Sequence, residues 1–218
     1  MPLSSLEIRE MRIGEELLLS GRIITGRDRA HRWMLEERPD AARAPYLKNG
    51  SDLSLRTDNA SRNGKWECRA AGPTTSMREE SYQADIIQEY KLRCVIGKGG
   101  MGERTAEALQ NSAAVYMSAV GGAAVFYARK IVSVEDVIRL ESFGMPEAMW
   151  VLQVRDFPVI VSMDAFGNSL HRDVEDKSRD SLPPVLQSNK KEILIFCCLM
   201  QGIQGPEKSC RRDFSPLS

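Results

Sequence analysis

The sequence has 218 residues, 42% hydrophobic and 28% charged, with 30 basic and 30 acidic side chains. That length accommodates one large domain, or one domain and a tail, with a substantial hydrophobic core. The balanced charge removes the electrostatic argument for non-specific binding to nucleic acid or to a membrane surface. No stretch of the sequence approaches the roughly 18 consecutive apolar residues of a membrane span, and no secretory signal is evident.

The cysteines show no CxxC spacing and no histidine at zinc-finger spacing; they are Cys68, Cys94, Cys197, Cys198 and Cys210. An odd number without such spacing suggests neither a disulfide framework nor a structural zinc site. The spacing of these cysteines also matches no local motif for an iron–sulfur cluster. A reducing, cytoplasmic compartment is the simplest expectation.

The N-terminal part of the chain predicts strand, helix and loop in that order. Leu17–Thr25 has the composition of one or two β-strands with a bend at Gly21, followed by a short helix from about Asp28 to Glu37. Residues 38–72 are rich in Pro, Gly, Asn, Asp and Ser, and we expect a long loop there with at most a short strand. A loop of that length is usually functional or disordered.

From residue 79 the pattern becomes a regular alternation. It predicts a helix over 79–91, a strand over 93–97, a helix over 103–113, a strand over 114–120, a glycine-opened helix over 121–131, and two closing strands over 149–158 and 159–170. Two successive β-to-α steps favour an α/β arrangement of layers. We expect one α/β domain over residues 1–172 and a tail of unassigned structure over 173–218. The tail's apolar run Ile193–Met200 is a candidate contact with another chain.

The first polar cluster is the segment Thr25-Gly26-Arg27-Asp28-Arg29-Ala30-His31. Arg27 and Asp28 follow the end of a predicted strand, and His31 lies one helical turn beyond them. Such a cluster offers a guanidinium for a carboxylate and an acid–imidazole pair for proton transfer. It is equally compatible with a helix that Asp28 caps while the arginines are solvated.

The second cluster is the segment Ala71-Gly72-Pro73-Thr74-Thr75-Ser76-Met77-Arg78. Three hydroxyls directly before a helix, together with the backbone N–H groups of its first turn, form a natural anion site. Arg78 could complete that site with a bidentate contact to a carboxylate. Taken in isolation, the same residues more often form a Ser or Thr cap beside an exposed arginine.

The third cluster, Gly97-Lys98-Gly99-Gly100-Met101-Gly102, lies between a predicted strand and a predicted helix. Its glycines permit close approach of the backbone to a ligand, but the segment fits neither the Walker nor the dinucleotide pattern. The functional interpretation is therefore Lys98 presented to a small anion, and the alternative is a tight turn with a solvated lysine. We interpret Gly121–Gly122 and residues 144–148 mainly as turns, with Glu147 a minor candidate, and expect His171 at the surface.

In this order and spacing, TGRDRAH, GPTTSMR, GKGGM, GGAA, GMPEAMW and VRDFPVIVSMDAFGN resemble a known family. The resemblance is to the β-subunit of class I (iron–sulfur) fumarate hydratase and L-tartrate dehydratase, which also forms the C-terminal part of single-chain class I fumarases. It covers about residues 6–171. It implies a swivelling β/β/α domain and a hydro-lyase that reversibly hydrates a dicarboxylate double bond, fumarate to malate, or alternatively an L-tartrate dehydratase.

The resemblance also implies a partner and a set of site residues. The catalytic [4Fe-4S] cluster would be carried by the α-subunit of a hetero-oligomer and not by this chain. Asp28 and His31 would orient the site and tune proton transfer, and Thr74 would take a proton from the carbon next to a carboxylate. The residues implied to bind the substrate are Arg27, Thr75, Arg78, Lys98 and Gly99.

The sequence departs from the family in three places. Residues 45–68 lack the usual aromatic–Gly–Pro segment, Arg78-Glu79-Glu80 replaces Arg-Met-Asp, and the tail has no recognised counterpart. The first and third departures motivate an alternative, a non-catalytic carboxylate-binding or regulatory module. Retention of the cationic and catalytic residues together argues against it, because a scaffold needs none of them.

Overall fold

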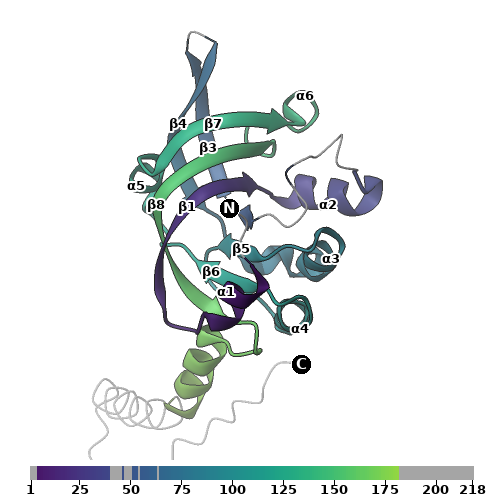
Figure 1. Ribbon diagram of the computed structural model, residues 1–218, viewed down its shortest axis with the longest axis vertical. Helices are drawn as coiled ribbons and strands as arrows, with labels where there is room; N and C mark the ends of the chain where they lie inside the picture. The colour runs from purple at the N-terminus through teal and green to yellow at the C-terminus, as the bar shows by residue number, and fades with distance from the viewer. Residues whose placement is uncertain (1–3, 40–45, 47–50, 54, 63, 182–218) are drawn as a thin grey trace, which may run out of the picture. The chain divides into compact units, whose positions relative to one another are not determined.

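The computed structural model describes residues 4–39, 46, 51–53, 55–62 and 64–181 (Figure 1). The chain divides into two compact units, Met1–Arg172 and Asp173–Ser218. The first is a mixed α/β structure, which agrees with the predicted α/β class. Of the second unit, the described residues 173–181 are helical, and the apolar run 193–200 lies outside the described residues.

The main sheet of the first unit curls and closes on itself. Its strand order is β1-β2-β5-β6-β8-β7, and β1 also pairs with β8. The strands are β1 (Glu16–Thr25), β2 (Ser51–Leu53), β5 (Cys94–Gly97), β6 (Val115–Ser118), β7 (Ile131–Ile138) and β8 (Met149–Met163). The first four run parallel, and β8 is antiparallel to β1, β6 and β7. Because β8 is long, this one strand pairs with three neighbouring strands.

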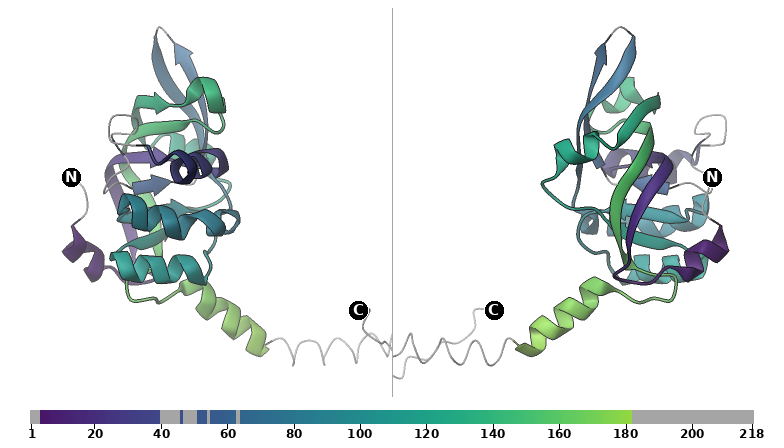
Figure 2. Two further views of the ribbon diagram at one scale, coloured as in Figure 1. Left: turned by 90° about the vertical axis from the view of Figure 1, so that its right-hand side faces the viewer. Right: turned by 60° about the vertical axis from the view of Figure 1, so that its left-hand side comes forward.

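Three helices cover one side of this sheet: α2 (Asp28–Glu37), α3 (Glu80–Tyr90) and α4 (Glu103–Ser112) (Figures 1 and 2). Their apolar faces form one buried core with the sheet, because apolar residues recur at helical spacing. In α4, for example, Thr105, Ala106, Ala108 and Leu109 are buried. These helices were predicted in the sequence, and their bounds agree within a few residues.

A second core lies on the other side of the sheet. It includes Trp150, Tyr127 and Phe157, and the short helices α1 (Ser5–Glu10) and α5 (Ala124–Ala128) contribute Ile8 and Ala128 to it. The helix α6 (Leu140–Phe143) precedes β8. Two cores on opposite sides explain why strands β5 and β6 are almost entirely buried.

The prediction of a long loop over residues 38–72 is wrong. The segment contains β2 and a two-stranded antiparallel sheet of β3 (Leu55–Arg62) and β4 (Lys65–Pro73), which projects from the body in Figures 1 and 2. Residues of low strand propensity form β3 because tertiary contacts decide the outcome. On β4, Trp66 packs edge-on against Trp150, with ring centroids 5.1 Å apart.

The prediction of a helix over residues 121–131 is correct only for α5, and β7 follows it. Strand β7 lies at the end of the sheet order, and its side chains are half-buried or exposed. Its sequence therefore lacks a clear alternation of apolar and polar residues that would predict a strand. The two predicted closing strands are one continuous strand, β8, in which Pro158 pairs with Leu18 of β1. Across the described part of the chain, no helix is both long and apolar enough to cross a membrane.

Candidate functional site

The parallel strands bring the predicted polar clusters to one edge of the sheet. Arg27 follows the end of β1, Lys98 follows the end of β5, and residues 119–122 follow the end of β6. The carboxyl ends of parallel strands are where α/β sheets bind their ligands. The segment Thr74–Arg78, which leaves β4, joins the same edge through its contacts with Lys98.

Thr25 fixes the end of β1 before the polar cluster begins. Its hydroxyl donates to the Ala148 carbonyl oxygen at 3.3 Å and accepts from the Trp150 N–H at 2.9 Å. The hydroxyl therefore ties β1 to the start of β8 and is used structurally.

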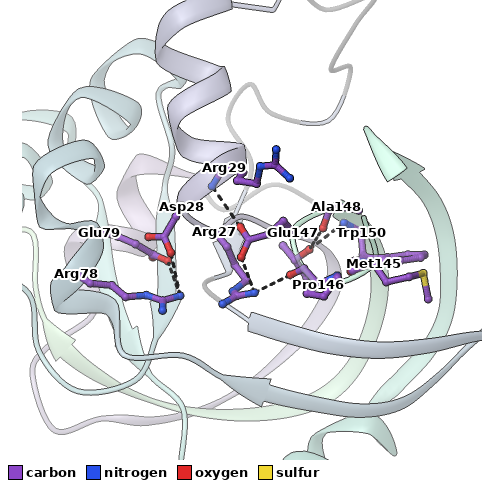
Figure 3. Close-up of polar contacts among 11 residues, drawn as sticks. Arg27, Asp28, Arg29, Arg78, Glu79, Met145, Pro146, Glu147, Ala148 and Trp150 are labelled. Atoms are coloured by element: carbon purple, nitrogen blue, oxygen red, sulfur yellow. Dashed lines mark hydrogen bonds and ion pairs between the residues drawn. The ribbon is translucent and has the colours of Figure 1, made fainter. Parts of the chain in front are cut away.

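Arg27 forms a nearly buried ion pair with Glu147. Its NH1 lies 2.8 Å from Glu147 Oε1 and donates to the Pro146 carbonyl oxygen at 2.8 Å (Figure 3). Glu147 Oε2 accepts from the Arg29 N–H at 3.2 Å, in the first turn of α2. The carboxylate thus caps a helix N-terminus, where a negative charge is stabilising, and orients Arg27. The side chains of Arg27 and Glu147 are only 12% and 19% exposed.

Arg78 lies between two carboxylates. Its NH2 is 3.4 Å from Asp28 Oδ2 and 3.9 Å from Glu79 Oε1 (Figure 3). The Arg78 and Asp28 side chains are 43% and 40% exposed, so a ligand carboxylate can reach the guanidinium. This contact brings the first and second clusters together.

His31 and Glu79 are fully buried behind that surface. His31 Nδ1 lies 3.9 Å from Glu79 Oε2. Glu79 therefore stands between the His31 imidazole and the Arg78 guanidinium. The carboxylate of Asp28 faces Arg78, and its role as the orienting partner of His31 stays a prediction.

Ser76 locks the second cluster to the third. Its N–H donates to the Lys98 carbonyl oxygen at 3.2 Å, and its Oγ accepts from the Lys98 N–H at 3.2 Å. Thr75 and Lys98 form a parallel β-bridge. A Cβ at Gly97 would lie 1.8 Å from Ser76 Oγ, so only glycine permits this approach. Burial raises the pKa of the neighbouring Tyr116, and the nearby Ser76 side chain opposes the shift.

Lys98 is half-buried and presents a cation at this edge. Among the residues that the structure describes, no carboxylate forms an ion pair with it. A Cβ at Gly121 would lie 2.8 Å from Lys98 Cδ, which places the lysine stem against the backbone of the loop after β6. Gly99 has φ +77° and open space at its Cβ position, and its carbonyl oxygen accepts from Ser118 Oγ at 3.1 Å. Thr75 is exposed and Thr74 is half-buried.

Glu80, the first residue of α3, binds the end of the third cluster at the start of α4. Its carboxylate accepts from the N–H of Gly102 at 2.7 Å and from the N–H and hydroxyl of Thr105 at 3.1 and 2.7 Å. The acid that departs from the family pattern is thus a helix cap. His171, expected at the surface, is half-buried, and its ring packs on Gly100.

The described residues do not fit the ligation of an iron–sulfur cluster. Within these ranges no group of three or more His, Cys, Asp or Glu side chains could hold a metal ion. Cys94 is buried with its Sγ 3.5 Å from the Met117 sulfur, and the Cys68 thiol donates to the Ala70 carbonyl oxygen at 3.4 Å. We therefore derive no reaction step through a cluster on this chain.

The structure brings the three clusters into one site, and it adds residues that the sequence did not assign. Glu147 was a minor candidate, Ser76 was one of the three hydroxyls of the second cluster without a role of its own, and Glu79 was not assigned to the site. Their partners lie far away in the sequence, so spacing carried no signal for them. For Glu147, the sequence offered the GMPEA motif, which together with the strand end at Thr25 could have indicated a place at the site.

Comparison with known proteins gives a consistent result. A family model described as fumarase C-terminus matches residues 2–174. A protein of Geobacillus stearothermophilus named "Putative fumarate hydratase class I" is 44% identical over 182 residues, which are 83% of this chain and 34% of that protein. The L(+)-tartrate dehydratase subunit beta of Escherichia coli (strain K12) is 38% identical over 172 residues, 78% of this chain and 83% of that subunit. The chain thus spans about a third of the first relative and most of the second.

Proposed function

Because the chain belongs to the fumarase C-terminus family, we propose that it is the β-subunit of a hydro-lyase. The reaction is the reversible hydration of a dicarboxylate double bond, with fumarate and malate as the substrate pair. The observation that carries the proposal is the half-buried Lys98, which is paired with no described carboxylate and is hydrogen-bonded to the segment that carries Arg78. A cation of this kind is suited to a substrate carboxylate.

The substrate-binding residues are the cations and the loops around them. Arg78 is accessible beside Asp28, so one carboxylate of the substrate exchanges with Asp28 on its guanidinium. Lys98 pairs with the other carboxylate, and the open backbone at Gly99 and the hydroxyl of Thr75 line the same edge. Arg27, held by Glu147, is the remaining residue assigned to substrate binding and lies at the end of β1.

Proton transfer is assigned to Thr74, Asp28 and His31. In the dehydration direction, the Thr74 oxygen takes the proton from the carbon next to a carboxylate, and the electron pair of that bond forms the double bond. The hydroxyl leaves from the neighbouring carbon with the electron pair of its C–O bond, and together with the abstracted proton it makes up the water molecule that is released. A threonine is a weak base at its ordinary pKa, so nearby cations must stabilise its ionised form. Asp28, which pairs with Arg78, and His31, which lies beside Glu79, tune this proton transfer in the proposal.

The partner is an α-subunit, and the assembly is a hetero-oligomer located in the cytoplasm. The E. coli relative is named a subunit beta, which supports a second subunit here. We assign the [4Fe-4S] cluster to that partner. The closed sheet with helices on one side is consistent with a swivelling β/β/α domain.

The test is an anaerobic assay of the full chain mixed with its cluster-bearing partner. We expect loss of fumarate absorbance only when both chains are present, and a parallel assay with tartrate selects the substrate. A complex that forms, holds an intact cluster and converts neither compound would contradict the proposal.

A second candidate function is L-tartrate dehydratase, which the E. coli relative favours by its name. Tartrate turnover without fumarate turnover would select it. A non-catalytic carboxylate-binding module would instead bind a dicarboxylate in the complex without converting it.

A further inference from the structure

The buried hydroxyl of Tyr127 joins the loop after β6 to strand β8. The Val120 N–H donates to Tyr127 Oη at 2.8 Å, and Tyr127 Oη donates to the Pro158 carbonyl oxygen at 3.2 Å. The side chain is 1% exposed, and its ring lies 4.5 Å from that of Phe157 between centroids. A tyrosine fixed on both sides in this way has one available orientation.

The loop that Tyr127 holds supports Lys98. The Ala119 N–H donates to the Gly97 carbonyl oxygen at 2.7 Å, so the loop is attached to β5 next to the lysine. Two residues further, the backbone of Gly121 lies against the lysine stem, because a Cβ there would be 2.8 Å from Lys98 Cδ. A lysine stem has four rotatable carbons, and the surface it lies on determines where its ammonium points.

We propose that Tyr127 is a positioning residue for Lys98. Its hydroxyl fixes the loop at Val120, and the loop holds Gly121 against the lysine stem. Tyr127 itself does not touch the substrate. The effect on turnover rests on the proposed function, whereas the effect on Lys98 is a property of this chain alone.

The first experiment measures the chain by itself. We compare the wild-type chain with Tyr127→Phe by amide hydrogen exchange and by NMR of the Lys98 side chain, assigned with Lys98→Arg. The matched control is Tyr90→Phe, which removes an equally short hydroxyl contact, to the Met34 carbonyl oxygen at 2.8 Å, on helix α3. We expect faster exchange at Val120 and a more mobile Lys98 in Tyr127→Phe only. An unchanged Lys98 signal would overturn the proposal whatever the enzyme does.

The second experiment uses the chain with its cluster-bearing partner. Tyr127→Phe should raise KM for the dicarboxylate about fivefold to tenfold, the factor equivalent to roughly one neutral hydrogen bond, with little change in kcat. In a Lys98→Met background the same substitution should have no further effect on KM. Equal effects of Tyr127→Phe in both backgrounds would indicate a merely structural role and overturn the proposal. If the wild-type complex does not turn over, only the proposed function fails, because the NMR result still decides the role of Tyr127.

Discussion

The carboxylate of Glu147 pairs with Arg27, which lies 120 residues earlier in the sequence and directly before helix α2. One oxygen lies 2.8 Å from Arg27 NH1, and the other accepts from the Arg29 N–H at 3.2 Å. Because both side chains of the ion pair are mostly buried, each charge has little access to water as an alternative partner. The pair therefore sets the position of Arg27 before any substrate binds.

Replacing Glu147 with Gln should destabilise the chain. The substitution leaves a largely buried guanidinium without its counter-charge and weakens the cap of α2, so we expect a loss of about 1–3 kcal/mol in the free energy of unfolding. Urea denaturation measures it. The control is Glu135→Gln, which breaks the exposed 2.6 Å pair with Arg22 and should change stability by less than about 1 kcal/mol. Equal losses in the two variants would contradict the role of Glu147.

Replacing Lys98 or Arg78 with Ala should reduce activity without unfolding the chain. Each change removes one charge-assisted contact to a substrate carboxylate, which is equivalent to about 1.5–3 kcal/mol, or about tenfold to 150-fold in kcat/KM. Steady-state assays of the complex measure the loss, and circular dichroism checks the fold. Lys65→Ala, which alters an exposed residue of β4, should retain full activity. Full activity in Lys98→Ala would refute the assignment.

The sequence predicted those elements that bury one regular face. Strands β5 and β6 are short and almost entirely buried, and α4 repeats its apolar residues at helical spacing, so each was identified with nearly correct bounds. Strand β3 was missed because its residues have little strand propensity, and pairing with β4 and burial of Thr57 and Asn59 determine its structure.

For the site as well, residues in a local motif could be predicted from the sequence, whereas residues defined by distant contacts could not. Arg27 and Lys98 could be proposed because each follows a predicted strand end within a recognisable motif, and Thr74 because its motif resembles that of the family. Glu79 and Glu147 depend on partners that only the folded chain provides, which are His31 and Arg27. The spacing of a motif predicts how residues within one segment lie relative to one another. It does not predict which other segment of the chain will pack against that motif.

Cys68 should be unreactive in the folded chain at moderate pH. Burial raises the pKa of its thiol to about 11 from 9.0. At pH 8 its thiolate fraction is then about a hundredfold lower than in the unfolded chain, and alkylation, followed by peptide mass mapping, should slow at least by that factor. Because only the unfolded thiol ionises between pH 9 and 11, this residue lowers the free energy of unfolding as the pH rises through that interval. Cys68→Ala should remove this part of the pH dependence, and an unchanged pH profile would show that the thiol does not contribute.

Replacing Gly97 with Ala should separate the hydroxyl segment from Lys98. The added Cβ would lie 1.8 Å from Ser76 Oγ and 2.7 Å from the hydroxyl of Tyr116, so the Ser76 side chain must move and Oγ must release its hydrogen bond from the Lys98 N–H. We expect a loss of about 2–4 kcal/mol in the free energy of unfolding and a large loss of turnover.

Gly72→Ala is the matched control for this substitution. A Cβ at Gly72 would meet only the Cβ of Ala124, at the ordinary contact distance of 3.5 Å. That variant should keep its melting temperature within a few degrees, as roughly 0.5 kcal/mol would imply. Thermal unfolding and the activity of the complex measure both variants. If Gly97→Ala were as stable and as active as Gly72→Ala, the contact between Ser76 and the end of β5 would not hold the two segments together.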